Sequence, residues 1–281
     1  MNVLALFDGM SCGQLALERA GIKVDNYFAS EVDKYAIKIA MKNYPNTIQL
    51  GDVRNVHSKD LPRIDLILAG SPCQGFSFAG KGLAFDDPRS ALFFELLRLV
   101  NELPEAYFLL ENVRMTKLHR DMITFFLKVA PVAINSSLVS AQDRYRIYWG
   151  NFDFPTPCDL GITLDTILQN PVDCPVGMEI RRKSKCLRVG GRNSLVGSRL
   201  DWDNPFQRIT KKAEVKGGNR SDMDTIHTPL VTRRYSPTEC ERLQTLPDGY
   251  TAGVSNTQRY KMLGNGFTAD VIAHILRHLP T

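Results

Sequence analysis

Long apolar runs are absent from this sequence of 281 residues. No stretch approaches the roughly 20 apolar residues that a membrane-spanning helix needs, which excludes an integral membrane protein. Residues 1–8 carry neither a basic leader nor a small-residue cleavage site. We therefore expect no membrane partner and a location in the cytoplasm or another reducing compartment.

Cysteine motifs and the common nucleotide-binding motifs are absent as well. The six cysteines are scattered, with no Cys-x-x-Cys pair and no Cys/His spacing that suits zinc, so we expect neither a metal site nor a disulfide framework. The sequence also lacks Gly-x-Gly-x-x-Gly, a phosphate loop with Lys-Ser/Thr, internal repeats and low-complexity tracts. The open question is whether one of the cysteines is a reactive thiolate.

Positive charge is concentrated in one stretch. The net charge of +5 is compatible with a nucleic-acid partner but does not establish one. Residues 181–220 hold twelve Lys/Arg against three acidic residues, a local charge of +9, which leaves −4 for the rest of the chain. This stretch is either a contact surface for a polyanion or a solvated basic face.

Short apolar runs alternate with amphipathic segments through the first 150 residues. We predict strands at 2–7, 26–30, 64–69 and 106–110, and helices at 14–21, 33–43, 90–102 and 121–129. Such alternation predicts an α/β fold, a parallel sheet with helices on both faces. Residues 131–150 are predicted to form two paired strands. Helices are expected from Ser236, which has capping-box spacing to Glu239, and within 256–279.

Chemically active residues lie where the predicted strands end: Asp8, Glu31, Asp52, Cys73 and Glu111. In parallel sheets the ligand binds at the carboxyl ends of the strands. The Gly-bearing turn 7–13 lets backbone N–H groups approach a ligand, Glu31 suits ribose hydroxyls, and Asp52 suits an adenine amino group. Together they favour an adenosine-bearing cofactor, although each carboxylate alone is compatible with a solvated strand end.

Cys73 follows Pro72 in what the sequence indicates is an exposed loop. A free cysteine is often buried and inert, whereas a nucleophilic thiolate needs positive charge nearby. Arg144 and Arg146 are the candidates, and their spacing of two places them on one side of a strand. They form either a charged outer face or a pair of donors for a base carbonyl and a phosphate. Glu111 is a candidate general acid toward a ring nitrogen.

These motifs, in this order, resemble those of the cytosine-C5 DNA methyltransferases. The matching pieces are Phe-Asp-Gly-x-x-x-Gly (7–13), Glu31, Asp52, Pro-Cys-Gln (72–74), Glu-Asn-Val (111–113), Gln-x-Arg-x-Arg (142–146), Glu-Arg-Leu-Gln (241–244) and Gly-Asn-Gly (264–266). The details look most like the branch of the animal de novo enzymes. The compact length looks more like a bacterial or bacteriophage enzyme, which places it in a bacterial or phage-infected cell.

The resemblance implies a Rossmann-like methyltransferase sheet that binds S-adenosyl-L-methionine and releases S-adenosyl-L-homocysteine. The catalytic domain would comprise 1–151 and 250–281, with a small irregular target-recognition region and hinge at 152–249, where the composition becomes rich in Pro, Gly, Asn and charge. The implied cofactor residues are Phe7, Asp8, Gly9, Met10, Ser11, Gly13, Glu31, Val32, Asp52, Val53, Pro72, Leu92 and Asn265.

The implied mechanism joins the catalytic residues. Cys73 adds to C6 of a flipped cytosine, Glu111 protonates or hydrogen-bonds N3, and Arg146 with Arg144 holds O2. The implied DNA contacts are Gln74, Ser77, Lys81, Arg89, Gln142, Arg188, Arg192, Arg233 and Arg234. The partner would be a short double-stranded DNA sequence, with a cognate restriction endonuclease as a candidate second partner, and we expect a monomer.

Two motifs depart from the family pattern, and two other functions stay open. The first motif has Met10-Ser11-Cys12 where more glycine is common, and the last is Gly-Asn-Gly-Phe rather than Gly-Asn-Ala/Ser-Val. A relative within the family methylates transfer RNA, so RNA is an alternative substrate. A catalytically inactive DNA-binding homologue is the other alternative, although Cys73 and Glu111 are both retained.

Overall fold

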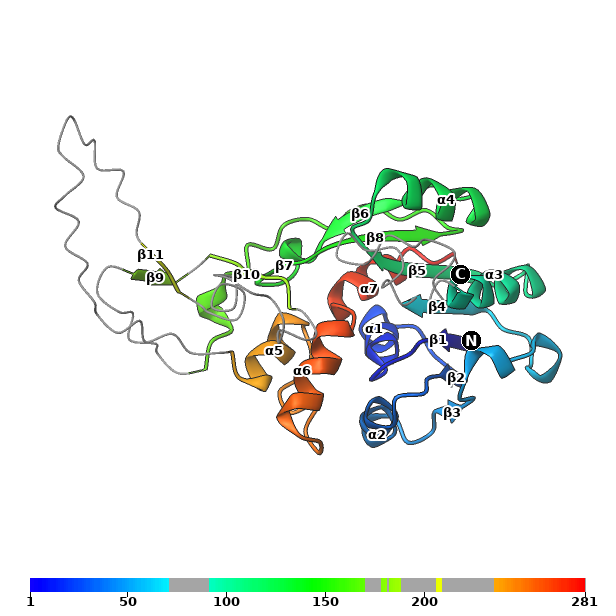
Figure 1. Cartoon of the computed structure of the whole chain (residues 1–281), viewed down its shortest axis with the longest axis horizontal. Coiled ribbons are helices and arrows are strands. Elements are labelled where there is room, and N and C mark those ends of the chain that lie inside the picture. Colours follow the sequence, from blue (N-terminus) through cyan, green and yellow to red (C-terminus); the bar gives the residue numbers. More distant parts are fainter. Residues whose placement is uncertain (71–90, 170–177, 181, 188–205, 209–234, 281) are drawn as a thin grey trace.

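The computed structural model describes residues 1–70, 91–169, 178–180, 182–187, 206–208 and 235–280. Its centre is a seven-stranded sheet in the order β3-β2-β1-β4-β5-β8-β6 (Figure 1). The strands of this sheet are β1 (Asn2–Leu6), β2 (Asn26–Ser30), β3 (Ile48–Gln49), β4 (Leu66–Gly70), β5 (Tyr107–Val113), β6 (Val132–Asn135) and β8 (Tyr145–Gly150). The helices are α1 (Cys12–Ala20), α2 (Lys34–Asn43), α3 (Ala91–Glu102), α4 (Lys117–Leu127), α5 (Pro237–Leu243), α6 (Asn256–Asn265) and α7 (Ala269–Leu276).

The predicted parallel sheet is confirmed for five strands and extended by two. Strands β3, β2, β1, β4 and β5 are parallel to one another, whereas β8 runs antiparallel to both β5 and β6. The β6–β8 pair is the one predicted within 131–150. The sheet is therefore mixed, and its carboxyl-end edge is formed by the parallel part.

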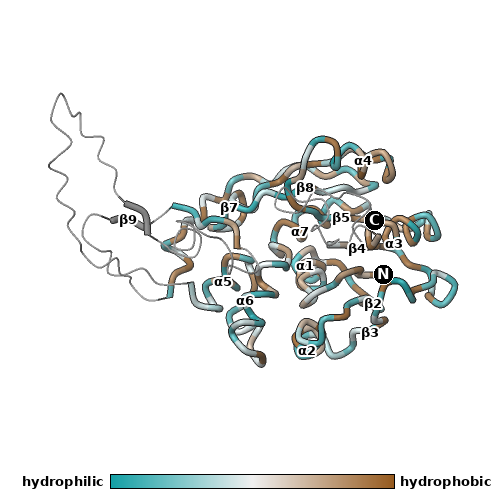
Figure 2. Tube along the Cα trace, viewed as in Figure 1, coloured by the Kyte–Doolittle hydropathy of each residue, from teal (hydrophilic) through white to brown (hydrophobic). Residues whose placement is uncertain are grey.

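Helices cover both faces of the sheet, as the apolar runs predicted. In β1, Val3 and Ala5 pack with α1 and α7, while Leu4 and Leu6 pack with α3 and α4 on the opposite face. Strands buried on both sides need apolar residues at every position, which is why β1 shows no alternation. Figure 2 shows these hydrophobic residues along the strands and in α3.

The strand register places the predicted functional positions at one edge. Leu6 of β1 is opposite Ser30 of β2, directly before Glu31, and Gly70 of β4 is opposite Glu111 of β5. Strand β5 continues to Val113, because β8 pairs with it over this length. Glu111 therefore lies within its strand rather than after its end, and three residues of sequence separate Gly70 from Cys73.

The carboxyl-terminal segment differs from the expectation in two ways. The region 256–279 contains two helices, α6 and α7, because the chain between Gly266 and Thr268 leaves the helical conformation. Helix α5 begins with the predicted capping box of Ser236 and Glu239. Beyond it, Leu243 and Leu246 pack in a core that includes Met10 and Ile39. The segment 235–249, predicted as part of the recognition region and hinge, thus packs with the body of the protein.

The beginning of the expected recognition region also joins the body. Phe152 and Phe154 pack in the core beneath α7, and Leu164 and Ile167 pack with α5. Two small sheets follow: β10 (Ser184–Lys185) pairs with β7 (Gln142–Asp143), and β9 (Met178–Ile180) pairs with β11 (Phe206–Arg208). Within the described part of the chain, no helix is long and apolar enough to cross a membrane.

Candidate active site

The turn between β1 and α1 is the first part of the site. Phe7, Gly9 and Ser11 all have left-handed backbone angles, with φ of 56°, 62° and 61°. This conformation costs a non-glycine residue about 1 kcal/mol or more, so surrounding contacts must hold it in place. Gly13 follows at the start of α1, and a Cβ there would lie 2.8 Å from the Tyr27 hydroxyl oxygen. Only glycine lets α1 approach β2 this closely.

Two tyrosine hydroxyls hold the turn. Tyr27 donates to Asp8 Oδ1 at 2.7 Å, and Tyr250 donates to the carbonyl oxygens of Met10 and Ser11 at 2.8 and 3.1 Å. The Ser11 hydroxyl also donates to the Asp8 carboxylate. Burial raises the pKa of Asp8 to about 7, although the bonds from Ser11 and Tyr27 oppose this change. In this structure the Asp8 carboxyl group is therefore bonded to Ser11 of the turn and to Tyr27 of β2.

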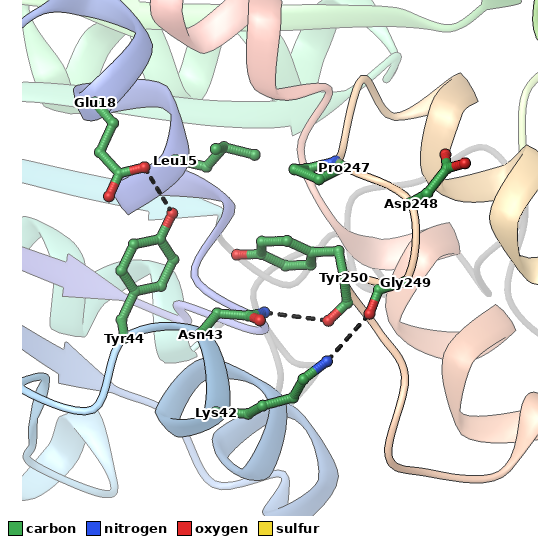
Figure 3. A pocket seen from close by; sticks show the side chains of 9 residues that line it. All are labelled: Leu15, Glu18, Lys42, Asn43, Tyr44, Pro247, Asp248, Gly249 and Tyr250. Atoms are coloured by element: carbon green, nitrogen blue, oxygen red, sulfur yellow. Dashed lines mark hydrogen bonds between the residues drawn. The ribbon is translucent and has the colours of Figure 1, made fainter.

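Tyr250 reaches the turn from a pocket of about 400 Å³ behind it (Figure 3). Asn43 Nδ2 donates to the Tyr250 carbonyl, and Lys42 Nζ donates to the Gly249 carbonyl, so the end of α2 fixes the loop that carries Tyr250. Glu31, Asp52 and Glu111 do not line this pocket. Its lining instead includes Tyr250, whose hydroxyl holds the turn between β1 and α1.

Glu31 links the ends of β1 and β2. Its Oε2 accepts the Gly9 N–H at 2.8 Å, and its Oε1 accepts the N–H groups of Val32 and Asp33 at 2.7 and 2.8 Å. Val32 is 70% exposed, which is unusual for an aliphatic residue next to a buried strand. The site edge therefore offers a fixed carboxylate beside an exposed apolar side chain.

The other expected cofactor residues differ in their burial and in their bonding partners. Asp52 forms an ion pair with Arg54, whose hydrogen bonds lower the pKa of the Asp52 carboxyl to about 2. Val53, Met10 and Ser11 are buried. Leu92 is half-buried on α3, and Asn265 is exposed at the end of α6.

The residues at this edge fit an adenosine-bearing methyl donor. Ribose hydroxyls need carboxylate acceptors, which Glu31 provides with its orientation fixed by three N–H groups. An adenine ring needs an apolar surface, and the exposed Val32 side chain lies next to that acceptor. The match to the cofactor rests on the chemistry of these groups and not on the size of a cavity.

The two departures from the family pattern meet in space. A Cβ on Gly266 would lie 2.7 Å from Met10 Cε and 3.4 Å from Cys12 Sγ. The larger residues of the first motif thus occupy the space that Ala or Ser would need in the last motif. Phe267 packs next to them, against Gly70 at the end of β4, where a Cβ would be 2.9 Å from its ring. The departures compensate each other.

Glu111 and Arg146 form the second part of the site. Arg146 Nε lies 2.8 Å from Glu111 Oε1, and their side chains are only 11% and 10% exposed. Glu111 is opposite Tyr148 in the β5–β8 register, so Arg146 is its diagonal neighbour on the same face. Burial is the largest single effect and lowers the pKa of Arg146, but Glu111, Cys186 and Tyr148 together outweigh it, so the pKa is raised overall. The pair joins a carboxylate and a guanidinium with little competing water.

Arg144 and Gln142 are buried and hydrogen-bonded within the protein. Arg144 is 2% exposed, and its guanidinium donates to the carbonyls of Leu187, Gly264 and Gly266 at 2.9–3.3 Å, so in this structure it does not reach a base. Gln142 is 0% exposed, so it is not a DNA contact here. Its amide donates to the Leu243 carbonyl and accepts the Leu187 N–H. Neither arginine lies on a charged outer face.

Ten predicted site residues lie outside the described residues: Pro72, Cys73, Gln74, Ser77, Lys81, Arg89, Arg188, Arg192, Arg233 and Arg234. Sequence reasoning also missed several residues that hold the site, namely Tyr27, Tyr250 and Cys186. Their partners lie far away in the sequence, and a single tyrosine or cysteine carries no pattern that would have revealed them.

A model of the family described as C-5 cytosine-specific DNA methylase matches residues 1–149 and 173–281. The chain belongs to this family. It is 30% identical to the type II methyltransferase M1.ScrFI of Lactococcus lactis subsp. cremoris, over 96% of this chain and 76% of the relative. It is 28% identical to the type II methyltransferase M.HhaI of Haemophilus parahaemolyticus, over 98% of this chain and 93% of the relative.

Solved structures agree on the fold of this methylase. The methyltransferase EhMeth of Entamoeba histolytica superposes with a TM-score of 0.72 at 17% identity, covering 99% of this chain and 97% of that one. A DNMT2 mutant of Spodoptera frugiperda superposes with a TM-score of 0.67 at 21% identity, covering 99% of both chains. The Rossmann-like methyltransferase fold is confirmed, and membership in the family makes the chain a DNA cytosine-C5 methyltransferase that uses S-adenosylmethionine.

Proposed function

We propose that this methylase modifies cytosine in a short duplex DNA sequence through a transient covalent bond between Cys73 and C6. The observation that carries the proposal is the Glu111–Arg146 pair, because it supplies both groups that a cytosine ring needs. Gly70, three residues before Cys73, is the register partner of Glu111, so the chain leads from that pair directly into the loop with the nucleophile.

The roles of the residues follow from their chemistry. The Cys73 thiolate adds to C6, and Glu111 holds N3 so that the ring electrons are directed to C5. Arg146 donates to O2 and stabilises the charge that develops there. The bound S-adenosylmethionine supplies an electrophilic methyl group to C5. Loss of the C5 proton then breaks the Cys73–C6 bond and restores the thiolate. The base must leave the helix stack first, at an expense of a few kcal/mol.

The cofactor would be held by residues of the β1–β2 edge. Glu31 suits the ribose hydroxyls, Val32 suits the adenine ring, and Asp52 suits the adenine amino group once it releases Arg54. Backbone groups of the turn 7–13 and Asn265 complete the set. Pro72 and Leu92 stay proposed as neighbours of the cofactor.

The recognition region is proposed to begin after the segment that ends at Leu187 and to end before Tyr235. Residues 188 and 192 on one side, and 233 and 234 on the other, are arginines that suit phosphate and base-edge contacts, and the +9 charge of 181–220 supports the same assignment. Gln74, Ser77, Lys81 and Arg89 stay proposed as contacts from the loop that carries Cys73.

The names of the curated relatives support a place in a type II modification system. We therefore propose a monomer that acts in the cytoplasm of a bacterial or phage-infected cell, with a cognate restriction endonuclease as a second partner. Expression of the gene in a strain that lacks DNA cytosine methylation tests this. Bisulfite sequencing should find methylated cytosines within one short common sequence, and methylation without a common sequence would contradict it.

Transfer RNA is the alternative substrate. Duplex DNA and transfer RNA, each offered separately with radiolabelled S-adenosylmethionine, distinguish the two. We expect label in the DNA, and label confined to the RNA would overturn the proposal.

A further inference from the structure

Each of the three nitrogen atoms of the Arg146 guanidinium lies close to a different partner, although the contact at Nε is an ion pair without hydrogen-bond geometry. Nε lies 2.8 Å from Glu111, and Nη1 donates to the Tyr145 carbonyl at 2.9 Å. Nη2 approaches the Cys186 sulfur at 3.9 Å. A thiol is a weak acceptor, so Nη2 is the nitrogen whose contact is most easily given up.

Cys186 is itself held by groups from another part of the site. Its S–H donates to the Leu187 carbonyl at 3.3 Å, and Arg144 Nη1 donates to the sulfur at 3.6 Å. The same Arg144 guanidinium binds the carbonyls of Gly264 and Gly266. A continuous chain of contacts therefore runs from the last motif through Arg144 and Cys186 to the Arg146–Glu111 pair.

The segment that carries Cys186 is anchored to the segment between β6 and β7. Ser184 donates its N–H to the Ala141 carbonyl at 2.7 Å, and Lys183 Nζ donates to the Ser137 and Ser140 carbonyls. Residue 188, where the proposed recognition region begins, follows directly after this anchor. Cys186 and Leu187 are therefore the last described residues before that region.

We propose that Cys186 is a positioning residue that holds Arg146 Nη2 for the cytosine and couples the recognition region to the catalytic pair. The proposal rests on the proposed function, because it assigns DNA recognition to the residues after 188. Before DNA binds, the thiol keeps the guanidinium in place. When the flipped base arrives, its O2 replaces the sulfur as the partner of Nη2, at little cost because the lost contact is weak.

Cys186→Ala removes the sulfur and leaves the backbone anchor intact. We expect kcat on unmethylated duplex DNA to fall about tenfold, since small misplacements of catalytic groups reduce rates by such factors. The KM for S-adenosylmethionine should stay unchanged, because Cys186 does not touch the residues assigned to the cofactor. Cys186→Ser keeps an acceptor and should recover most of kcat. Cys158→Ala, at an exposed free cysteine elsewhere in the chain, is the matched control.

Discrimination against near-cognate DNA separates coupling from plain structural support. In Cys186→Ala, no sulfur holds the Arg146 guanidinium before the base binds. Relative to the parent protein, the variant should therefore lose more of its kcat on the cognate site than on a site with one altered base pair. The proposal is overturned if Cys186→Ala keeps kcat within twofold of Cys158→Ala. It is also overturned if Cys186→Ala and Cys186→Ser lose the same fraction of kcat and both have a lowered Tm. A parent protein without activity on DNA would instead refute the proposed function.

Discussion

The cofactor end and the base end of the same sheet edge are built in different ways. At the cofactor end, Glu31 binds backbone N–H groups and Asp8 binds Ser11, three residues away, and the Tyr250 hydroxyl adds one distant contact to backbone carbonyls of the turn. At the base end, Arg144 is held by the carbonyls of residues 187, 264 and 266, all of them more than 40 residues away.

This difference explains what each end tolerates. A site held by backbone groups keeps its shape when side chains vary, which is consistent with Met10 and Cys12 replacing glycine opposite Gly266. A site held by a buried ion pair and a forked guanidinium depends on those side chains themselves. We therefore expect substitutions at the base end to be the more damaging.

The largest effect is expected for Glu111→Gln. The amide keeps the shape of the side chain but removes its charge and its ability to exchange a proton with N3. We expect kcat to fall by about 10²- to 10⁴-fold, while binding of S-adenosylmethionine is unchanged. Steady-state kinetics with Glu105→Gln, an exposed position just before β5, as control provides the measurement. If Glu111→Gln weakened only the binding of S-adenosylmethionine and left kcat unchanged, the assignment of Glu111 to the base end would be contradicted.

The second prediction is that Asp8, at the cofactor end, makes the stability of the protein depend on pH. Because burial raises the pKa of Asp8 to about 7, the folded state keeps this proton at pH values where the unfolded chain has lost it. Stability contributed by the proton must therefore fall as the pH rises from about 5 to 7, by about 2 kcal/mol. Asp8→Asn should remove this slope. Urea unfolding of both proteins from pH 5 to pH 8 measures it, and parallel curves would show that Asp8 is not perturbed.

Arg144→Lys probes the long-range contacts of the base end. Lysine keeps the charge but cannot reach three carbonyls with one planar group, so some of them are left buried without a donor. We expect a loss of about 2–4 kcal/mol in the free energy of unfolding. Arg114→Lys, on the exposed side of the same region, should change it by less than about 0.5 kcal/mol. Equal effects at both positions would argue against a structural role for Arg144.

The smallest effect is expected where the two departures meet. Gly266 has an ordinary φ of −66°, so Gly266→Ala adds a steric clash, most severely with Met10 Cε at 2.7 Å and less so with the Met262 carbonyl oxygen at 3.2 Å. We expect a loss of about 1–3 kcal/mol in stability and weaker cofactor binding. Met10→Ala in the same chain should relieve the clash. The double variant should therefore lose less stability than the sum of the losses of the two single variants. Additive losses would mean that the two motifs do not compensate each other.

Sequence alone predicted much of the fold because β1, β2, β4 and β5 are buried on both faces. Their apolar runs are therefore unbroken, and the helices between them are amphipathic. The edge position of Glu31 and Glu111 followed from the same pattern. The capping box at Ser236 is likewise a purely local signal.

The remainder depended on contacts that a local pattern does not encode. The spacing of Arg144 and Arg146 correctly placed them on one side, where both approach Cys186, but it did not reveal that Arg144 binds backbone carbonyls. Gln142 looked like a DNA contact because its partners, near residues 187 and 243, are far along the chain. The same reason hid the packing of 235–249 on the body.

Covalent trapping tests the central claim most directly, namely that Cys73 attacks the base beside the Glu111–Arg146 pair. Duplex DNA that contains 5-fluorocytosine cannot release the enzyme, because C5 carries no proton to lose. With S-adenosylmethionine present, the parent protein should form a complex that survives denaturing electrophoresis, and Cys73→Ser should form none. Equal trapping by both proteins, or none by a parent that methylates ordinary DNA, would contradict the claim.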